Sequence, residues 1–190
     1  MVGQRIRLLR QELGVSLSEL ARRAGIGKAT LSGLETGTRN PTLETLWAIT
    51  AQLGVPIAAV LDPPIAPYVV RGTAIEATLL RVFEESDATF ELYRMRIPPG
   101  IQQTSPAHPK GVSEHITVFS GILLAGPVDE PMTARPGDYI SWPAHVPHSY
   151  VVLGEAEVHA SLLIRYPTTV RSSTRPDEPT HRLDGMTDYP

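Results

Sequence analysis

Histidine and carboxylate side chains are the residues of this sequence best able to do chemistry. The chain has six histidines and no cysteine, so it can form neither a disulfide nor a thiolate metal site. Two imidazoles and one carboxylate can bind zinc, or iron as a facial triad with open positions. Three of the six histidines stand in two spaced patterns: His108-x-Lys110-x3-Glu114-x6-Gly121 and Gly137-x5-Pro143-x-His145-x2-His148.

A second kind of chemistry is indicated by residues 16–35, which can form two short helices that meet at Gly25. The apolar residues here fall on the inward faces: Leu20, Ala21, Ile26, Leu31 and Leu34. The outward face of the second helix is left to Lys28, Ala29, Ser32 and Gly33, with Thr30 at its edge. Such a helix fits the DNA major groove, where its N-terminal residues can meet base edges. The alternative is a helical bundle that binds a protein partner.

The composition is that of a folded protein with a mildly basic first third. The 190 residues allow one large or two small domains, and 42% hydrophobic with 19% charged residues argues against disorder. Residues 1–62 carry seven basic and five acidic side chains, a balance of +2, while the remainder carries ten and fifteen, a balance of −5. The longest apolar runs, such as 55–61, are far shorter than a membrane span of about 20 residues. We therefore expect a cytoplasmic protein without a membrane partner.

Five short helices are expected in residues 1–61, and they position the outward-facing residues. Their expected ranges are 4–13, 16–24, 27–35, 43–53 and 56–61, with glycines or prolines at the boundaries. Ser16 and Glu19 have the spacing of a capping box, in which the serine hydroxyl accepts from the Glu19 amide and the Glu19 carboxylate reaches back. Thr42 is expected to cap the fourth helix.

Strands are expected to position the histidine patterns. Residues 62–67 contain three prolines and predict a short, stiff linker. Beyond it the hydrophobic period changes to two, which predicts strands at 74–84, 89–97, 116–124, 139–142, 149–153 and 157–164. Many short strands at regular spacing favour a closed antiparallel barrel or a jelly roll in residues 68–166. Residues 167–190 are polar and proline-bearing and predict a loosely held tail.

Residues 3–61 resemble the helix-turn-helix domain of the XRE family, which includes the phage repressors. The shared pattern is S-x-x-E-L-A-x-x-A-G-I, then T-L-S-x-L-E-x-G-x-R-x-P, then T-L-x-x-I-x-x-x-L-G-V. The resemblance implies a five-helix, lambda-repressor-like domain that binds double-stranded DNA. It places base reading at Lys28, Ala29 and Gly33, with Thr30 and Ser32 on the same helix, and phosphate contacts at Ser16, Thr36, Thr38 and Arg39. It also implies a buried ion pair between Arg10 and Glu35.

That domain departs from the family pattern at two points. Leu17 stands where the family often has a glutamine near a phosphate. The reading helix is also poor in long polar side chains: Lys28 can donate to guanine and Ala29 can touch a thymine methyl, but Gly33 reads nothing. We therefore expect part of the DNA specificity to come from duplex shape.

Residues 68–166 resemble the cupin family, whose metal-binding members hold a divalent metal with three histidines and one carboxylate. His108, Glu114 and His148 match three of these four ligands, and Lys110 replaces the second histidine. The resemblance implies a zinc, iron or nickel site. In the competing interpretation no metal is bound, and Lys110 pairs with Glu114 or binds the carboxylate of a small ligand. The expected effector pocket comprises His108, Lys110, Glu114, Trp142, His148 and Tyr150.

The remaining histidines give weaker indications. His115 should face opposite to Glu114 by strand alternation, and His145 replaces a turn glycine and should be exposed. His159 could face either way, and His181 lies in the tail.

These features lead to a ligand-responsive transcription regulator as the main functional hypothesis. The barrel would sense a small-molecule effector, form a homodimer and set the spacing of two DNA-reading domains about one helical turn apart. The first alternative is a cupin metalloenzyme, a dioxygenase or isomerase, with an appended DNA-binding domain. The second is a constitutive repressor whose barrel serves only as a dimerisation module. The Lys110 replacement and the lack of another acid, base or nucleophile arrangement favour the regulator over an enzyme.

Overall fold

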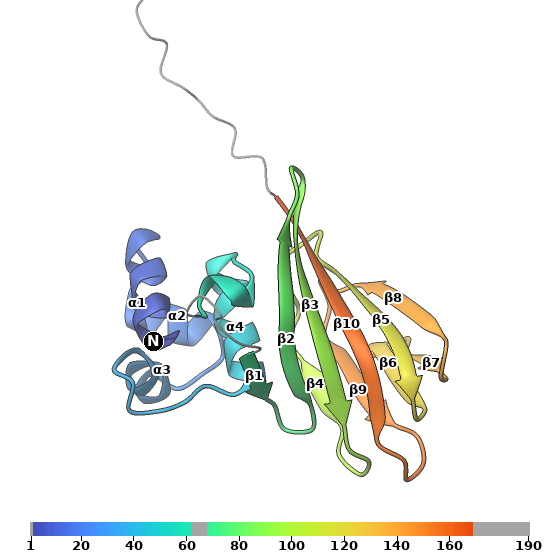
Figure 1. Ribbon diagram of the computed structural model, residues 1–190. Coiled ribbons are helices and arrows are strands. Elements are labelled where there is room, and N and C mark those ends of the chain that lie inside the picture. The colour runs from blue at the N-terminus through green and yellow to red at the C-terminus, as the bar shows by residue number, and fades with distance from the viewer. Residues whose placement is uncertain (1, 62–67, 169–190) are drawn as a thin grey trace, which may run out of the picture.

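A computed structural model describes residues 2–61 and 68–168, and Figure 1 shows a helical unit beside a unit built of strands. The expected linker, 62–67, and nearly all of the expected tail, 167–190, lie outside the described residues, as does His181. Within the described part of the chain, no helix is long and apolar enough to cross a membrane.

The helical unit contains four α-helices and a 3-10 turn. These elements are α1 (Val2–Glu12), α2 (Leu17–Arg23), α3 (Lys28–Glu35), α4 (Leu43–Leu53) and the turn η1 (Ile57–Ala59). The prediction of a fifth helix over 56–61 is therefore wrong. The reason is that Gly54 ends α4 in the left-handed conformation and Pro63 disfavours helix in the residue before it, so the short stretch between them closes only one tight turn.

The helix starts follow the expected caps, with one difference. Ser16 Oγ accepts from the Glu19 amide at 3.1 Å, and Thr42 Oγ1 accepts from the Thr45 amide at 3.3 Å. The predicted return bond of the capping box is not the one that Glu19 makes, because its carboxylate faces two arginines one turn later. It accepts from Arg22 and Arg23 at 2.7–3.0 Å instead.

The strands form two antiparallel sheets. The larger sheet has the order β1-β2-β3-β10-β5-β8, and the smaller has the order β4-β9-β6-β7. The strand bounds are β1 (Tyr68–Arg71), β2 (Glu76–Glu84), β3 (Ala88–Ile97), β4 (Gln103–Ser105), β5 (Ser113–Ser120), β6 (Leu123–Pro127), β7 (Met132–Ala134), β8 (Tyr139–Pro143), β9 (His148–Val152) and β10 (Val158–Pro167).

This arrangement is an open two-sheet jelly roll, and the expectation of a closed barrel is wrong. Closure would require a continuous ladder across both sheet edges, but the edge strands β4 and β7 of the smaller sheet have only three residues each. The single strand expected at 116–124 is also two strands, β5 and β6. Gly121 separates them with a φ of 76°, a conformation in which a side chain would also meet the Glu157 carbonyl oxygen.

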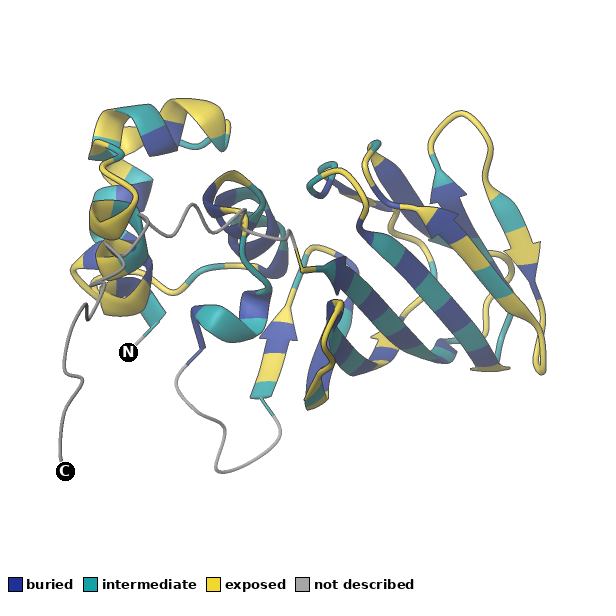
Figure 2. Ribbon diagram, turned by 90° about the horizontal axis from the view of Figure 1, so that it is seen from above, coloured by how far each residue is buried: buried dark blue, intermediate teal, exposed yellow. Residues whose placement is uncertain are grey.

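The space between the two sheets is the core that positions the site. Buried and partly exposed residues alternate along β10, as the period-two pattern predicts, and Figure 2 shows the same alternation on neighbouring strands. Glu114 and Ile116 on β5 lie beside Ile164 and Leu162 on β10 in this register. Because alternate residues point inward, a polar residue in phase with the core is forced into the interior.

Candidate functional site

The DNA-reading face expected on α3 is exposed at its N-terminal end. Lys28 and Ala29 are exposed, while Thr30, Ser32 and Gly33 are half-buried. All four of the residues expected to contact phosphates are exposed: Ser16, Thr36, Thr38 and Arg39. The structure thus leaves this surface open to a partner.

The loop after α3 is folded back onto the helix. Thr38 Oγ1 donates to the Gly33 carbonyl at 3.1 Å, and the Arg39 amide donates to the same carbonyl at 3.1 Å. A Cβ on Gly33 would lie 3.0 Å from Cδ of Arg39. The small size of Gly33 therefore lets the stem of Arg39 lie across α3, which gives Gly33 a structural role in addition to the base-reading position expected for it.

An ion pair joins α1 to α3, as predicted. Arg10 donates from Nε and Nη2 to the two oxygens of Glu35 at 2.6 and 2.8 Å, and from Nη1 to the Val15 carbonyl at 2.9 Å. These bonds with Glu35 raise the pKa of Arg10. The fork geometry fixes the orientation of α3 against α1.

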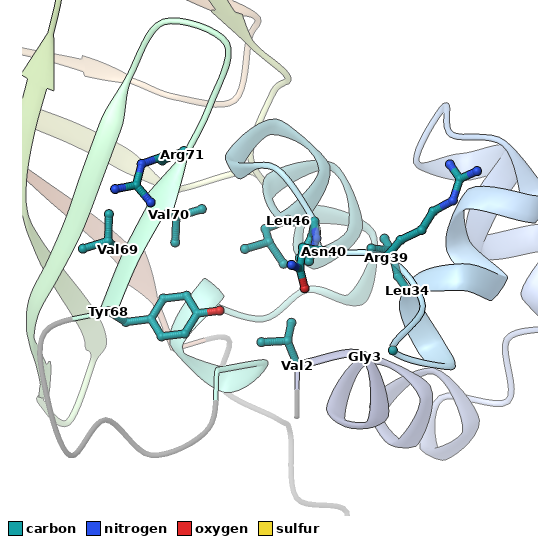
Figure 3. Close-up of a pocket in the computed structure, with 12 residues that line it drawn as sticks. Val2, Gly3, Leu34, Arg39, Asn40, Leu46, Tyr68, Val69, Val70 and Arg71 are labelled. Atoms are coloured by element: carbon teal, nitrogen blue, oxygen red, sulfur yellow. The ribbon is translucent and has the colours of Figure 1, made fainter.

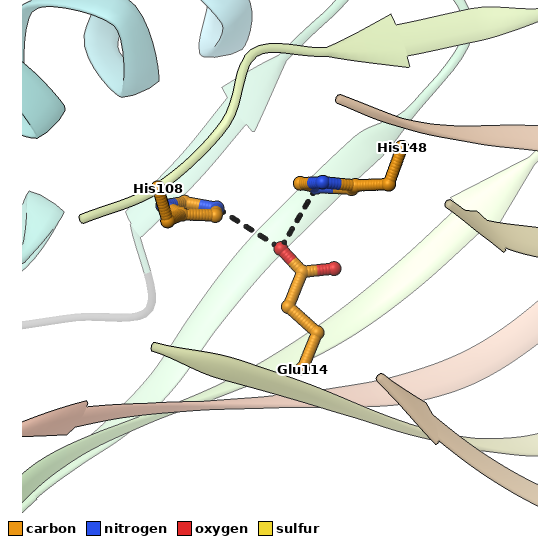
Figure 4. A group of neighbouring side chains, drawn as sticks. All are labelled: His108, Glu114 and His148. Carbon is orange, nitrogen blue, oxygen red and sulfur yellow. Dashed lines mark hydrogen bonds and ion pairs between the residues drawn. The ribbon is translucent and has the colours of Figure 1, made fainter. Parts of the chain in front are cut away.

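The two histidines and the carboxylate of the cupin patterns meet between the sheets. Glu114 comes from β5 of the larger sheet and His148 from β9 of the smaller one, while His108 precedes β5. All three are buried. Figure 4 shows both imidazoles directed at one carboxylate oxygen: Nε2 of His108 lies 3.0 Å and Nε2 of His148 lies 3.2 Å from Oε1 of Glu114.

The backbone holds each of these side chains in place. The His108 amide donates to the Ala144 carbonyl at 2.8 Å, which fixes the loop before β5 against the end of β8. Nδ1 of His148 lies 2.9 Å from the Val146 carbonyl and donates to it. The second oxygen of Glu114 accepts from the Tyr150 hydroxyl at 2.5 Å. The ring nitrogens facing Glu114 are therefore both Nε2.

This donor set fits a divalent cation. Because Nδ1 of His148 carries the proton that it donates to Val146, its Nε2 in the neutral ring has a lone pair, and that atom has no hydrogen-bond partner among the described residues. Two ligand atoms that each bind an ion at about 2.1 Å lie roughly 3.0–3.4 Å apart. The two separations from Oε1 of Glu114, 3.0 and 3.2 Å, match that range, and all three ligand atoms lie within 4.8 Å of one another. Hydrogen bonding from the far ring nitrogen also orients a metal-binding histidine.

The charges within the cluster are coupled. Burial alone would raise the pKa of Glu114, but His148 and His108 hold it well below its usual range. Burial alone would lower the pKa of His148, but the nearby charge of Glu114 and the hydrogen bond to the Val146 carbonyl raise that pKa. The buried negative charge of Glu114 can therefore be compensated in two ways: by a proton on His148 Nε2, or by a cation bound by the three side chains.

Two aromatic residues expected in the pocket do lie beside the histidines. The ring centroids of Trp142 and His148 are 5.9 Å apart, and those of Tyr150 and His148 are 5.8 Å apart. Both aromatic residues are buried. They form an apolar wall around His148.

Lys110 is not part of this cluster. Its side chain is exposed, and it lines a separate cavity of about 310 Å³ together with Pro56, Thr89 and Tyr166. The predicted pairing of Lys110 with Glu114 is wrong, because His108, His148 and Tyr150 occupy both carboxylate oxygens. The turn at Gly111, with a φ of 91°, separates Lys110 from the interior.

The other histidines lie outside the cluster. His145 is exposed, as expected, and His159 is partly exposed and lies 2.8 Å from Glu157. His115 faces away from Glu114, as alternation predicts, and contacts Ser113 and Tyr139 at 2.9 and 2.5 Å.

Sequence reasoning missed a second buried carboxylate, Glu91 on β3. Its Oε1 accepts from the Ala58 amide in η1 at 2.6 Å, and its Oε2 accepts from the Tyr93 hydroxyl at 2.9 Å. Burial raises the pKa of Glu91. The period-two alternation of β3 could have revealed that Glu91 is buried, because Glu91 is in phase with the buried residues Tyr93, Met95 and Ile97.

Sequence reasoning also missed a contribution from the helical unit. Trp47 on α4 is buried and meets the ring of His108 edge to face, with ring centroids 5.9 Å apart at 79°. No period within α4 could indicate this contact, since it joins two units that are far apart in the sequence.

Comparison with known proteins identifies both units. Residues 6–60 match the helix-turn-helix family model and residues 93–164 match the cupin domain model. The chain is 34% identical over 166 residues to the HTH-type transcriptional regulator SutR of Escherichia coli, covering 85% of this chain and 93% of that protein. It is 44% identical over 63 residues to the regulator SinR of Bacillus subtilis, covering 33% of this chain and 57% of SinR.

A solved structure shares the whole arrangement. The crystal structure of an HTH_3 family transcriptional regulator from Vibrio cholerae superposes with a TM-score of 0.73 at 24% identity, covering 87% of this chain and 95% of that one. At this identity the likeness establishes the shared fold. Together with the match to SutR along nearly its full length, it confirms both resemblances drawn from the sequence. The chain belongs to the XRE-type helix-turn-helix transcriptional regulators that carry a C-terminal cupin domain.

Proposed function

We propose that this regulator binds double-stranded DNA through α3, and that a divalent cation held by His108, Glu114 and His148 changes its affinity for that DNA. The cation would act alone or as the anchor for a small-molecule effector. The observation that carries the proposal is the convergence of two buried Nε2 atoms on one oxygen of Glu114, at 3.0 and 3.2 Å.

The DNA contacts are proposed from the exposed surface of α3 and its flanking turns. Lys28 is assigned to the bases and Arg39 to a phosphate, and relatives such as SinR are transcriptional regulators with a similar helical unit. A side chain that reads a base is worth about 1–3 kcal/mol of discrimination, whereas a phosphate contact weakens binding on every sequence. Replacing Lys28 should therefore reduce sequence preference, while replacing Arg39 should reduce affinity uniformly.

The cation is proposed from the chemistry of its three protein ligands. When bound, it would supply a Lewis acid with open positions for an oxygen or nitrogen of an effector. The protein's own groups do the rest: Val146 orients the ring of His148, Tyr150 holds the free oxygen of Glu114, and Trp142 limits the access of water. A cupin enzyme has a similar requirement, but SutR, which is 34% identical and covers 85% of this chain, is a transcriptional regulator, so we propose regulation.

We propose further that the regulator acts as a homodimer in the cytoplasm, where it would meet its operator. Helix-turn-helix proteins commonly read two half-sites about 34 Å apart, which a single copy of α3 cannot do.

Metal content tests the site directly. The full chain, purified without chelator and then loaded with zinc, iron(II) or nickel(II), is expected to retain about one ion per chain. His148→Ala should lose most of that ion, because it removes one of three protein ligands. His145→Ala is the matched control, since His145 is exposed and three residues away, and it should bind as the wild type does. Equal binding by the wild type and His148→Ala would place the ion elsewhere and refute the site.

A further inference from the structure

The DNA-binding unit closes one side of the cupin site with its own side chain. Trp47 lies in the middle of α4, the helix that follows the reading helix, and its ring edge meets His108 inside the cupin unit. On another side His108 meets the ring of Tyr166, with centroids 6.0 Å apart. His108 is thus enclosed between one residue of each unit, so its orientation affects packing on both sides.

A second contact joins the same two units from the interior of the sheets. Glu91 is completely buried, yet it sends one carboxylate oxygen to the backbone amide of Ala58, in the last turn of the helical unit. Burying a carboxylate is costly unless hydrogen bonds compensate. Here the compensation comes from the helical unit and from Tyr93, so separating the two units would leave the carboxylate with one partner. Ala59, the next residue, accepts from Arg5 of α1 at 3.1 Å, which connects this turn to the rest of the helical unit.

A third contact between the units lies away from the site. Oε1 of Glu44, in the first turn of α4, accepts from the Thr73 amide in the turn between β1 and β2 at 2.5 Å. This contact holds the units together without touching the histidines or Glu91. Removing it therefore provides a matched control for removing the contacts made by Trp47 and Glu91.

The units are not fully packed against each other elsewhere. A cavity of about 500 Å³ lies between α1, the loop after α3 and strand β1. Its lining residues, among them Val2, Leu34, Arg39 and Tyr68, are drawn in Figure 3. Space beside β1 permits the helical unit to shift against the sheets without a steric clash at this point. The direction of such a shift would then be set by the contacts that remain.

We infer that Trp47 and Glu91 are the positioning residues through which occupancy of the His108–Glu114–His148 site changes the orientation of the DNA-binding unit. The inference rests on the proposed function. Without a cation, Nε2 of His108 is hydrogen-bonded directly to Oε1 of Glu114 at 3.0 Å, and Trp47 packs against the ring in that position. A cation held between these two atoms would replace the hydrogen bond and move the ring relative to Glu114, so that Trp47 must pack against it in a different arrangement. Glu91 keeps the η1 end of the unit in place, so the adjustment becomes a rotation of α4 and of the reading helix beside it. Such coupling requires the two arrangements to differ in affinity for both DNA and the site.

The test measures the affinity of the full chain for a DNA duplex selected from a random pool, once in zinc and once in chelator. The quantity compared between variants is the ratio of these two affinities. A ratio of about 5- to 150-fold is the usual range for coupled sites. Glu91→Leu and Trp47→Phe should reduce the ratio to less than about twofold while zinc still binds. Glu91→Gln keeps the shape and an acceptor oxygen and should retain most of the ratio. Glu44→Ala should leave it unchanged, even if its DNA affinity alters in both states.

The outcomes separate this inference from the proposed function. If the wild type binds no zinc, the site itself fails and the inference falls with it. If the wild type binds zinc and responds, but Glu91→Leu and Trp47→Phe respond equally, the coupling route is wrong while the site stands. A loss of response in Glu44→Ala as great as in Glu91→Leu would mean that any interdomain contact matters and would also refute the assignment.

Fluorescence gives a readout that does not depend on DNA. The chain has two tryptophans, so Trp142→Phe leaves Trp47 as the only indole. Its emission should change on addition of zinc and saturate with the binding curve. Unchanged emission in a protein with bound zinc would show that Trp47 does not sense the site.

Discussion

Loss of the Arg10–Glu35 pair should destabilise the DNA-binding unit more than loss of any exposed pair. In the variant Glu35→Ala the guanidinium of Arg10, with 11% of its side chain exposed, keeps one partner among the described residues, the Val15 carbonyl. Removing one partner of a fully buried pair costs about 3–5 kcal/mol. Because Arg10 retains one hydrogen bond and limited access to water, we expect a cost of about 2–3 kcal/mol in the free energy of unfolding.

The assay is urea unfolding followed by the fluorescence of Trp47, in the Trp142→Phe background so that the emission reports on the helical unit. The double variant Arg10→Met/Glu35→Leu removes both charges together and should recover most of the loss, because the penalty comes from the unpaired charge. Glu19→Ala serves as a control, since its partners Arg22 and Arg23 are exposed and such pairs contribute little. Equal stability of Glu35→Ala and Glu19→Ala, or a double variant weaker than the single one, would refute this reasoning.

Three further predictions concern packing, pH and DNA. Gly3→Ala should lower the free energy of unfolding of the helical unit by about 2 kcal/mol or more, because a Cβ would lie 1.8 Å from the Leu34 carbonyl oxygen. Urea unfolding with the same fluorescence probe measures this loss. An unchanged urea midpoint would contradict the close packing of α1 on α3. Since the pKa of His148 is raised above 6.5, its protonated form stabilises the metal-free fold below that pH, and this contribution is lost as pH rises through the folded-state pKa. Unfolding in chelator should therefore show a decline of stability above pH 6.5 that is reduced in His148→Asn; identical profiles would contradict it. Arg39→Ala should lower the salt dependence of DNA binding by about one unit of slope, whereas Arg94→Ala, an exposed arginine of the cupin unit, should not; equal slopes would remove Arg39 from the DNA surface.

The sequence predicts the local structure well where one signal dominates. Ser16 and Thr42 cap their helices because a side-chain oxygen meets an otherwise free amide, and this depends only on neighbouring residues. The fifth helix failed because the run up to Pro63 is apolar enough to look helical but too short to complete an α-helix. The strands β1, β4 and β7 were missed because strands of three or four residues carry too few alternations to show a period.

The part of the candidate site that local spacing encodes was predicted, and the part that depends on distant segments was not. His108, Glu114 and His148 stand in recognisable spacings, and strand alternation directs the two strand residues inward. Lys110 was placed in the pocket by analogy with a histidine, but the turn at Gly111 directs it outward. Glu91 and Trp47 act through contacts between segments that are distant in the chain, and no local pattern encodes such contacts.

Control of DNA binding by the His108–Glu114–His148 site is tested most directly by measuring the DNA affinity of the wild-type chain in saturating zinc and in chelator. The same pair of measurements is made for His148→Ala and His145→Ala. We expect the wild type and His145→Ala to change affinity by at least about fivefold between the two conditions, and His148→Ala to show the same affinity in both. An equal response from His148→Ala, or no response from a wild-type chain that has bound zinc, would contradict the claim that this site controls DNA binding.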